Sequence, residues 1–304
     1  MAAPTAATAT AASESPVERA AAAVADEAPG VRALIVMREG EPLLERYYGG
    51  ASAAEPFETH SITKSVLSLL VGVAIAEGDL PGVDARVGDL LDVPRNADPR
   101  VRDITLRQLL TMTAGWDDEP VRGPDVVAAL LERPLARAPG ARWTYDSGSA
   151  HLVSAMLARA TARSAAQYAE EKLFSPLGIQ PLDWPADPQG VTSGGAGLVL
   201  RARELALLGE LVRNDGRWGD ERLVPAEWVR ESTRRQVDTD DPDLGYGYLW
   251  FVNGRLGVYA AVGYGGQLLA VAPEADAVVV VTGVPEAAPD QRRVLELLLP
   301  ALRP

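Results

Sequence analysis

A serine and a lysine stand three residues apart in the stretch "ETHSITKSVLSLL", at Ser61 and Lys64. On an α-helix, side chains three positions apart lie on one face, so the hydroxyl and the amine can approach each other. Serine becomes an effective nucleophile when a neighbouring base accepts its proton, and a neutral lysine can be that base. The spacing therefore predicts nucleophilic catalysis by Ser61, with Lys64 as the general base.

Lysine is rare in this chain. Lys64 and Lys172 are two of 29 basic residues, which leaves 29 − 2 = 27 arginines. An arginine at position 64 would stay protonated and could not accept a proton. Burial and the positive end of a helix both lower the pKa of an amine. A lysine at position 64 therefore favours the role of a general base, although the S-x-x-K pattern also occurs by chance in many helices.

Tyr145 is the candidate for passing the proton to a leaving group. It lies in "RWTYDSGSAHL", two residues before Ser147, in the one Y-x-S pattern of the chain. Near cationic or dipolar groups a phenol can be partly ionised and act as acid and base in turn. The same letters also fit a turn followed by a helix N-cap, so a structural role stays open.

The stretch "GYGGQ" at 263–267 is the candidate for binding an oxyanion. Glycines at a strand edge let a substrate carbonyl approach the backbone N–H groups. Glycines in a strand also mark bulges and bends, so this stretch has two interpretations.

Other catalytic groups are poorly represented. No G-x-S-x-G elbow occurs, and the two histidines, His60 and His151, lie far apart, so a Ser-His-Asp triad is disfavoured. We expect His151 to be a packing or capping residue and His60 a packing residue that can line the cleft. Since the chain has no cysteine, thiolate chemistry and disulfides are excluded. We expect no metal and no cofactor.

Composition restricts the partners. The chain has 304 residues and a net charge of −13, which opposes binding to nucleic acid. The longest apolar run, at 66–76, is too short to cross a membrane. The first residues lack the basic region and the continuous apolar run of a signal peptide, so we expect none. We expect a cytoplasmic protein that acts on a small molecule, and a monomer or a homodimer fits equally well.

Hydrophobic patterns predict an α+β fold. A helix over 16–28 precedes two strand-like runs separated by Gly40, and a helix over 61–77 ends at Gly78. Strand patterns return after position 244, and an amphipathic helix closes the chain. These patterns predict one antiparallel sheet that is built from both termini and flanked by helices.

The segment between these strands reads as helical, with many Pro/Gly turns. We therefore expect a disordered tail at 1–14, a sheet domain made of 15–79 and 196–304, and a mainly helical subdomain at 80–195. A cleft between the sheet and the helical part would hold the active site.

The three motifs resemble, in order and spacing, those of the serine β-lactamase and penicillin-binding-protein superfamily. The chain is similar to its class C β-lactamase-related branch, which includes esterases, D-amino-acid peptidases and 6-aminohexanoate-oligomer hydrolases. The resemblance covers about 30 to 300 and extends to the stretches "DITLRQLLTMTAGW", "GAGLVLRARELALLGELVRNDGRW", "LVPAEWVRES" and "LGYGYLWFV".

This resemblance implies a β-lactamase/transpeptidase-like fold and an acyl-enzyme mechanism. Ser61 would be the nucleophile, Lys64 its base and Tyr145 the proton carrier. The backbone N–H groups of Ser61 and Gln267 would form the oxyanion hole. Ser147 stands where many relatives have asparagine, and it would hydrogen-bond Lys64 or the substrate.

The third motif departs from the family pattern. β-Lactamases usually carry Lys-Thr-Gly there, whereas this chain has Tyr264, Gly265 and Gly266. Loss of a charge-assisted hydrogen bond costs about 1.5–3 kcal/mol, or roughly 10- to 150-fold in binding. We therefore expect hydrolysis of carboxylic esters or small amides. The alternatives are β-lactamase or D,D-peptidase activity, and a catalytically idle binding or sensor module.

Overall fold

The computed structural model describes residues 14–121 and 123–303. The tail predicted at 1–14 lies outside the described residues, apart from Glu14. The described chain forms α-helices, 3₁₀ turns and one π-helical turn, together with strands that pair in antiparallel fashion.

The helix predicted over 16–28 is present as Pro16–Glu27, and the Ser15 hydroxyl caps it by accepting a hydrogen bond from the backbone N–H of Glu18. The helices are α1 (Pro16–Glu27), α2 (Ile62–Glu77), α3 (Val87–Leu90), α4 (Leu106–Leu110), α5 (Val126–Leu131), α6 (Ser147–Thr161), α7 (Ala165–Ala169), α8 (Ser175–Leu177), α9 (Ala202–Arg213), α10 (Ala226–Thr233) and α11 (Gln291–Leu302). Short helical turns lie at Pro99–Asp103, Glu170–Phe174, Tyr264–Gly266, Pro273–Ala275 and Pro285–Ala287.

The main sheet has the strand order β2-β1-β12-β11-β10-β9-β8-β7. Because β1 pairs with β12, with Ile35 opposite Val280, the N-terminal hairpin joins the C-terminal strands. The predicted antiparallel sheet from both termini is therefore confirmed. The strands are β1 (Val31–Arg38), β2 (Glu41–Tyr47), β3 (Pro56–Glu58), β4 (Val199–Arg201), β5 (Arg217–Trp218), β6 (Glu221–Arg222), β7 (Val237–Asp238), β8 (Leu244–Tyr246), β9 (Phe251–Asn253), β10 (Val258–Gly263), β11 (Gln267–Ala272) and β12 (Ala277–Gly283).

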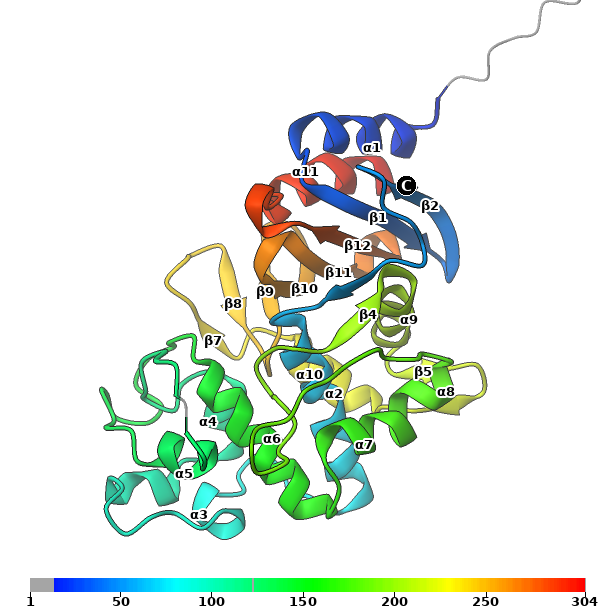
Figure 1. Ribbon diagram of the computed structural model, residues 1–304. Helices are drawn as coiled ribbons and strands as arrows, with labels where there is room; N and C mark the ends of the chain where they lie inside the picture. The colour runs from blue at the N-terminus through cyan, green and yellow to red at the C-terminus, as the bar shows by residue number, and fades with distance from the viewer. Residues whose placement is uncertain (1–13, 122, 304) are drawn as a thin grey trace, which may run out of the picture.

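Both faces of the sheet are covered, which explains the continuous valine run of β12. Successive side chains of a strand point to opposite faces. Val279 and Val281 pack into a core with α1 and α11, whereas Val278 and Val280 pack into a second core with α2 and α9. Figure 1 shows α1 and α11 together beyond the sheet, on the side away from α2.

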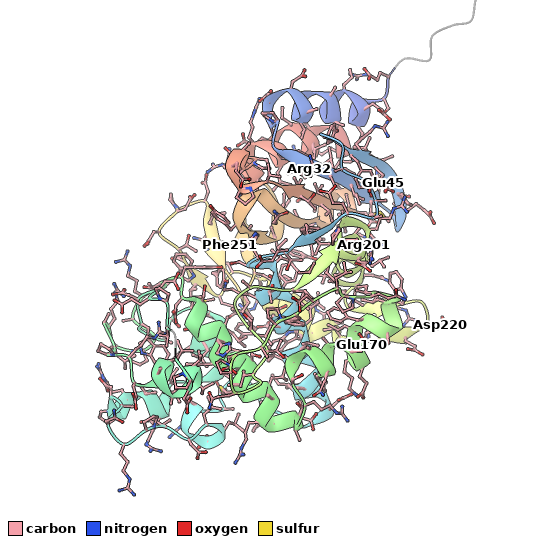
Figure 2. The ribbon with its side chains drawn as sticks, viewed as in Figure 1. Arg32, Glu45, Glu170, Arg201, Asp220 and Phe251 are labelled. Atoms are coloured by element: carbon pink, nitrogen blue, oxygen red, sulfur yellow. The ribbon has the colours of Figure 1, made fainter. Side chains whose placement is uncertain are left out.

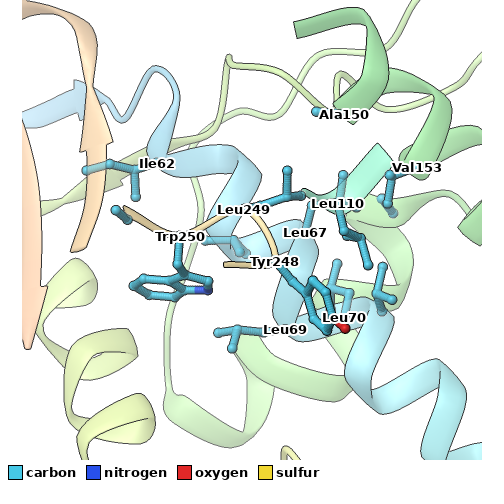
Figure 3. Close-up of a cluster of buried hydrophobic side chains, with 14 of the residues drawn as sticks. Ile62, Leu67, Leu69, Leu70, Leu110, Ala150, Val153, Tyr248, Leu249 and Trp250 are labelled. Carbon is cyan, nitrogen blue, oxygen red and sulfur yellow. The ribbon is translucent and has the colours of Figure 1, made fainter. Parts of the chain in front are cut away.

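Helix α2 joins the sheet to the helical segment. It is buried from Ile62 to Ala74 and contacts β10, β11, α6, α7 and α10. As predicted, it ends at Gly78, whose φ of 83° is the left-handed conformation that glycine tolerates. Figure 3 shows Leu67 of α2 near Leu249, which lies between β8 and β9, and Leu70 of α2 near Tyr248 in the same buried cluster.

Helices α3 to α8 lie between α2 and β4 in the sequence. One continuous apolar core extends from the sheet face through α2 into these helices. The boundaries at 79/80 and 195/196 therefore stay a prediction, because the packing does not separate the two parts.

Candidate active site

The start of α2 holds Ser61 in a constrained position. His60, directly before it, has a φ of 49°, a left-handed conformation that is uncommon for a residue other than glycine. The backbone N–H of Thr59 donates to the Leu198 carbonyl at 2.8 Å, and the hydroxyls of Thr59 and Thr63 lie 3.1 Å apart. Ser61 is the N-cap residue, yet its hydroxyl makes no capping hydrogen bond. The hydroxyl is thus left for another partner.

That partner is Lys64, whose side chain is buried at 1% exposure. Its Nζ lies 2.9 Å from Ser61 Oγ and donates to the Gly195 carbonyl at 2.7 Å. A carbonyl only accepts, so a neutral amine keeps an N–H toward Gly195 and has a lone pair for the serine proton. Burial lowers the pKa of Lys64 to about 8, and the charges of Asp118 and Asp146 oppose that shift. The predicted approach of Ser61 and Lys64 is thus observed.

This pKa leads to a prediction about the pH dependence of any reaction that uses the pair. The neutral amine is the basic form, and with a pKa of about 8 it makes up about a tenth of Lys64 at pH 7. We expect kcat/KM to rise about tenfold per pH unit below pH 8 and to level off above it. Initial rates of ester turnover across this range, corrected for spontaneous hydrolysis, measure it. An inflection near the ordinary histidine pKa of about 6.5 would instead indicate a histidine base.

Tyr145 lies against the lysine. Lys64 Nζ is 4.8 Å from the centre of the Tyr145 ring, which stacks on Phe251 of β9 at a centroid distance of 6.3 Å. Phe251, the first residue of β9, is labelled in Figure 2. Burial raises the pKa of Tyr145 to about 12, although a hydrogen bond with Ser61 lowers it. The expectation of a partly ionised phenol is therefore wrong for the resting site, since desolvation outweighs the favourable contacts and the phenol stays neutral.

Ser147, the first residue of α6, lies beside the same lysine. Its backbone N–H donates to Asp118 Oδ1 at 2.9 Å. A Cβ built on Gly195 would lie 3.2 Å from Ser147 Cβ and 3.8 Å from Lys64 Nζ, so the three residues are neighbours. The hydrogen bond predicted from Ser147 to Lys64 or to the substrate stays a prediction.

The third motif differs from the open strand edge that the glycines suggested. Residues Tyr264–Gly266 form a 3₁₀ turn that joins β10 to β11, and Gly265 and Gly266 have φ values of 77° and 83°. A Cβ on Gly266 would lie 2.2 Å from Pro289 Cδ, so the space beside this glycine is filled by protein. These two glycines permit a tight turn and close packing, and they do not line the cavity described below.

The turn is nevertheless close to the nucleophile. A Cβ on Gly263 would lie 2.4 Å from the Thr59 carbonyl, so glycine lets β10 approach the chain just before Ser61. Tyr264 is 69% exposed, and its ring lies perpendicular to that of His60 at a centroid distance of 5.5 Å. The Gln267 side chain bonds the backbone of Gly283 instead, with Nε2 donating at 2.9 Å and Oε1 accepting at 3.1 Å.

A cavity of about 810 Å³ opens over these groups. It brings together Ser61, Ser147 and Tyr264 from the three motifs, and Lys64 lies beneath it. Carboxylates at Asp118, Glu119 and Asp187 also line it, together with His60, His151, Pro120, Val121, Val126, Leu130 and residues of the 185–196 segment.

His151 lines this cavity, but both of its ring nitrogens are engaged. Nε2 lies 3.1 Å from Asp187 Oδ2, and Nδ1 accepts from the backbone N–H of Gly194 at 3.5 Å. Neither nitrogen is free to accept the proton of Ser61. The histidine instead ties α6 to the segment that ends at Gly195, in agreement with the predicted packing role.

Sequence reasoning missed Gly195, Asp118 and Asp187. The Gly195 carbonyl is 131 positions from the lysine it binds. No spacing rule connects residues so distant, and a backbone acceptor has no sequence signature. Asp118 lies two residues after the stretch "DITLRQLLTMTAGW", in a run of acidic residues of the kind that is ordinary on a protein surface.

Metal sites and membrane-spanning helices are two other features that the described residues could have formed. No group of three or more histidine or acidic side chains there is arranged to hold a metal ion. Within residues 14–121 and 123–303, none of the helices has the length and apolarity needed to cross a membrane.

Comparison with known proteins agrees with this geometry. A family model described as beta-lactamase matches residues 17–298. This chain belongs to the beta-lactamase family. Its antiparallel sheet flanked by helices is the β-lactamase/transpeptidase-like fold of the serine β-lactamase and penicillin-binding-protein superfamily.

Individual relatives of this beta-lactamase-family chain are distant. The probable fimbrial assembly protein FimD, serogroup H1, of Dichelobacter nodosus is 33% identical over 126 residues, which cover 38% of this chain and 32% of that protein. The chain spans about a third of the length of the curated relatives it matches.

Two solved structures are similar in fold. A putative 6-aminohexanoate-dimer hydrolase from Bacillus anthracis has a TM-score of 0.76 at 19% identity and covers 92% of this chain and 79% of that one. EstCE1, a hydrolase with promiscuous acyltransferase activity, has a TM-score of 0.77 at 18% identity. The match covers 93% of this chain and 97% of that one. Both likenesses show a shared fold.

Proposed function

We propose that this protein hydrolyses carboxylic esters or small amides through a covalent acyl-Ser61 intermediate. The observation that carries the proposal is the Lys64 amine, buried and with its pKa lowered to about 8, at 2.9 Å from the Ser61 hydroxyl. A serine with such a neighbour is an activated nucleophile. The proposal includes no cofactor.

The reaction begins when Ser61 Oγ attacks the substrate carbonyl carbon and its proton passes to the neutral Lys64. The carbonyl oxygen becomes an oxyanion, which accepts hydrogen bonds from the backbone N–H groups of Ser61 and Gln267. As the bond to the leaving group breaks, Tyr145 gives its proton to the leaving oxygen or nitrogen and receives the one held by Lys64. The acyl group then remains on Ser61.

Water completes the cycle. It attacks the acyl carbonyl while Tyr145 and Lys64 together accept its proton, and the second tetrahedral intermediate collapses. The bond to Ser61 Oγ breaks, the carboxylic acid leaves, and the proton returns to the serine. This order uses the neutral phenol as the first donor, which suits a pKa of about 12.

Charge favours neutral esters and amides over β-lactams. Asp118 and Glu119 line the cavity, and Tyr264 stands where a β-lactamase usually has a cation for the antibiotic carboxylate. Like charges repel, and the missing cation removes a charge-assisted hydrogen bond. The names of the two structural neighbours, a hydrolase with acyltransferase activity and a putative 6-aminohexanoate-dimer hydrolase, support the ester or amide assignment.

The direct test is intact-protein mass spectrometry after brief exposure to a fluorophosphonate or p-nitrophenyl butyrate. We expect one adduct, mapped to Ser61 by peptide analysis and absent from Ser61→Ala. A folded wild-type protein without any adduct would contradict the proposal and favour an idle binding module. Nitrocefin turnover at a rate comparable to ester turnover would overturn the preference for esters and amides.

A further inference from the structure

Arg133 and Asp146 form a buried ion pair beside the catalytic cavity. Nη1 and Nη2 of Arg133 donate to Oδ1 and Oδ2 of Asp146, each at 3.0 Å. Their side chains are 8% and 2% exposed. A two-pronged pair with so little exposure fixes distance and orientation together.

The Asp146 end of the pair sets the geometry of the second motif. Asp146 lies between Tyr145 and Ser147, and its carboxylate caps α6. It accepts hydrogen bonds from the backbone N–H groups of Gly148 and Ser149, at 3.1 and 2.8 Å, and from the Ser149 hydroxyl at 2.6 Å. With both oxygens so held, the backbone on either side of Asp146 has little freedom.

The other end of the pair holds the loop that carries Asp118. Nη1 of Arg133 also donates to the carbonyl of Asp117 at 3.1 Å and to that of Glu119 at 3.5 Å, one on each side of Asp118. The Asp118 carboxylate in turn accepts the backbone N–H of Ser147 at 2.9 Å. One guanidinium therefore joins the cavity wall to the start of α6.

The surroundings of Arg133 match its shape. Its guanidinium lies 5.1 Å from the centre of the Trp116 ring, and Trp116 Nε1 donates to the Arg133 carbonyl at 3.1 Å. A Cβ on Gly148 would lie 2.6 Å from Nη2, so glycine leaves the space the guanidinium occupies. Buried ion pairs are weak evidence for stability, because apolar replacements are often neutral or stabilising. The placement of this pair suggests a role beyond stability.

We infer that Arg133 is a positioning residue of the active site, which holds Tyr145 and Asp118 in one arrangement around Lys64. The inference rests on the proposed function for its effect on catalysis. Arg133 is not among the residues that line the cavity and does not contact the reacting atoms. It therefore acts through Asp146 and the 116–119 loop. A catalytic group misplaced by 1 Å can cost about 100-fold in rate. Weakening the hydrogen bonds of Arg133 should therefore lower kcat more than it changes KM.

The test compares Arg133→Lys with Arg213→Lys. Arg213 makes a similarly enclosed pair with Glu210, at 2.8 Å and with 16% and 6% exposure, but lies outside the residues that line the cavity. We expect Arg133→Lys to lower kcat for a p-nitrophenyl ester by about 10- to 100-fold with KM within about threefold. Arg213→Lys should keep kcat within about twofold at a similar loss in Tm. If Arg133→Lys and Arg213→Lys both fold and have equal kcat values, the inference is overturned.

Hydrogen exchange gives a readout that does not depend on turnover. Arg133→Lys should speed exchange at the amides of Ser147, Gly148 and Ser149, which Asp118 and Asp146 hold, and leave α9 unchanged. Unchanged exchange at these amides would contradict the positioning role, even if the wild type forms no Ser61 adduct and the proposed function fails. The adduct experiment thus decides the function, and exchange decides the positioning.

A second variant covers the case in which Arg133→Lys does not fold. Trp116→Phe keeps an aromatic ring beside the guanidinium but removes the indole N–H that bonds the Arg133 carbonyl, together with part of the buried ring system. We expect Trp116→Phe to lower kcat several-fold and to speed hydrogen exchange at the amides of Gly148 and Ser149. A folded Trp116→Phe with wild-type kcat and wild-type exchange would count against the inference.

Discussion

Replacing Lys64 with arginine is expected to lower ester turnover by about 10²- to 10⁴-fold, the usual contribution of a general base. The guanidinium keeps a positive charge near Ser61 but does not release its proton at any working pH, so it cannot accept the serine proton. Steady-state kinetics on p-nitrophenyl butyrate measure the effect. The fluorophosphonate adduct on Ser61 should form more slowly by a similar factor.

The chain offers a matched control in its other lysine. Lys172 pairs with Glu77 at 2.6 Å on the surface, away from the cavity, so Lys172→Arg should keep wild-type turnover. Arginine is larger than lysine and could disturb the buried site by its size alone. Lys64→Met therefore serves as a second variant, because methionine fits the site and has no basic group. If either Lys64 variant retained more than a tenth of wild-type turnover, Lys64 would not be the base.

Replacing Tyr145 with phenylalanine is expected to lower kcat by about 10²- to 10⁴-fold. The ring that contacts Lys64 and stacks on Phe251 is kept, and only the hydroxyl near Ser61 is lost. The leaving group then lacks its proton donor. Since an alkoxide or amine leaves far less readily than p-nitrophenolate, we expect a larger loss with an ethyl ester than with a p-nitrophenyl ester.

Tyr246→Phe is the control for this variant. Tyr246 belongs to the same aromatic cluster and packs on Phe251 at 4.9 Å, whereas the contacts with Lys64 and Ser61 are made by Tyr145. We expect wild-type kinetics from it. Tyr145→Phe with equal losses for both esters would indicate that the hydroxyl does not protonate the leaving group, and wild-type activity would remove Tyr145 from the mechanism.

Local patterns predicted much of the fold. The helix that carries Ser61 and Lys64, its end at Gly78 and the sheet built from both termini are all present. These features depend on short-range periodicity and on the conformational freedom of glycine, which a sequence displays directly. The approach of Ser61 and Lys64 is also a short-range feature, because a three-residue step on a helix brings their side chains to the same face.

Burial or packing decided the outcome at two other motifs. The phenol of Tyr145 was expected to be partly ionised, but desolvation raises its pKa to about 12. The glycines at 265 and 266 fitted either an open strand edge or a bend, and they form a turn that packs against Pro285 and Pro289. Neither burial nor a neighbour twenty residues further on can be read from the motif itself.

The sequence by itself determined the spacing of the proposed nucleophile and base, the helix that presents them and the order of the three motifs. Only the tertiary structure decided what surrounds that pair: the Gly195 carbonyl that orients the amine, the burial that lowers its pKa, and the ion pair of Arg133 with Asp146 beside Tyr145. The reason is physical. Helical spacing is a property of neighbouring residues, whereas desolvation and long-range hydrogen bonds exist only once distant segments are packed together.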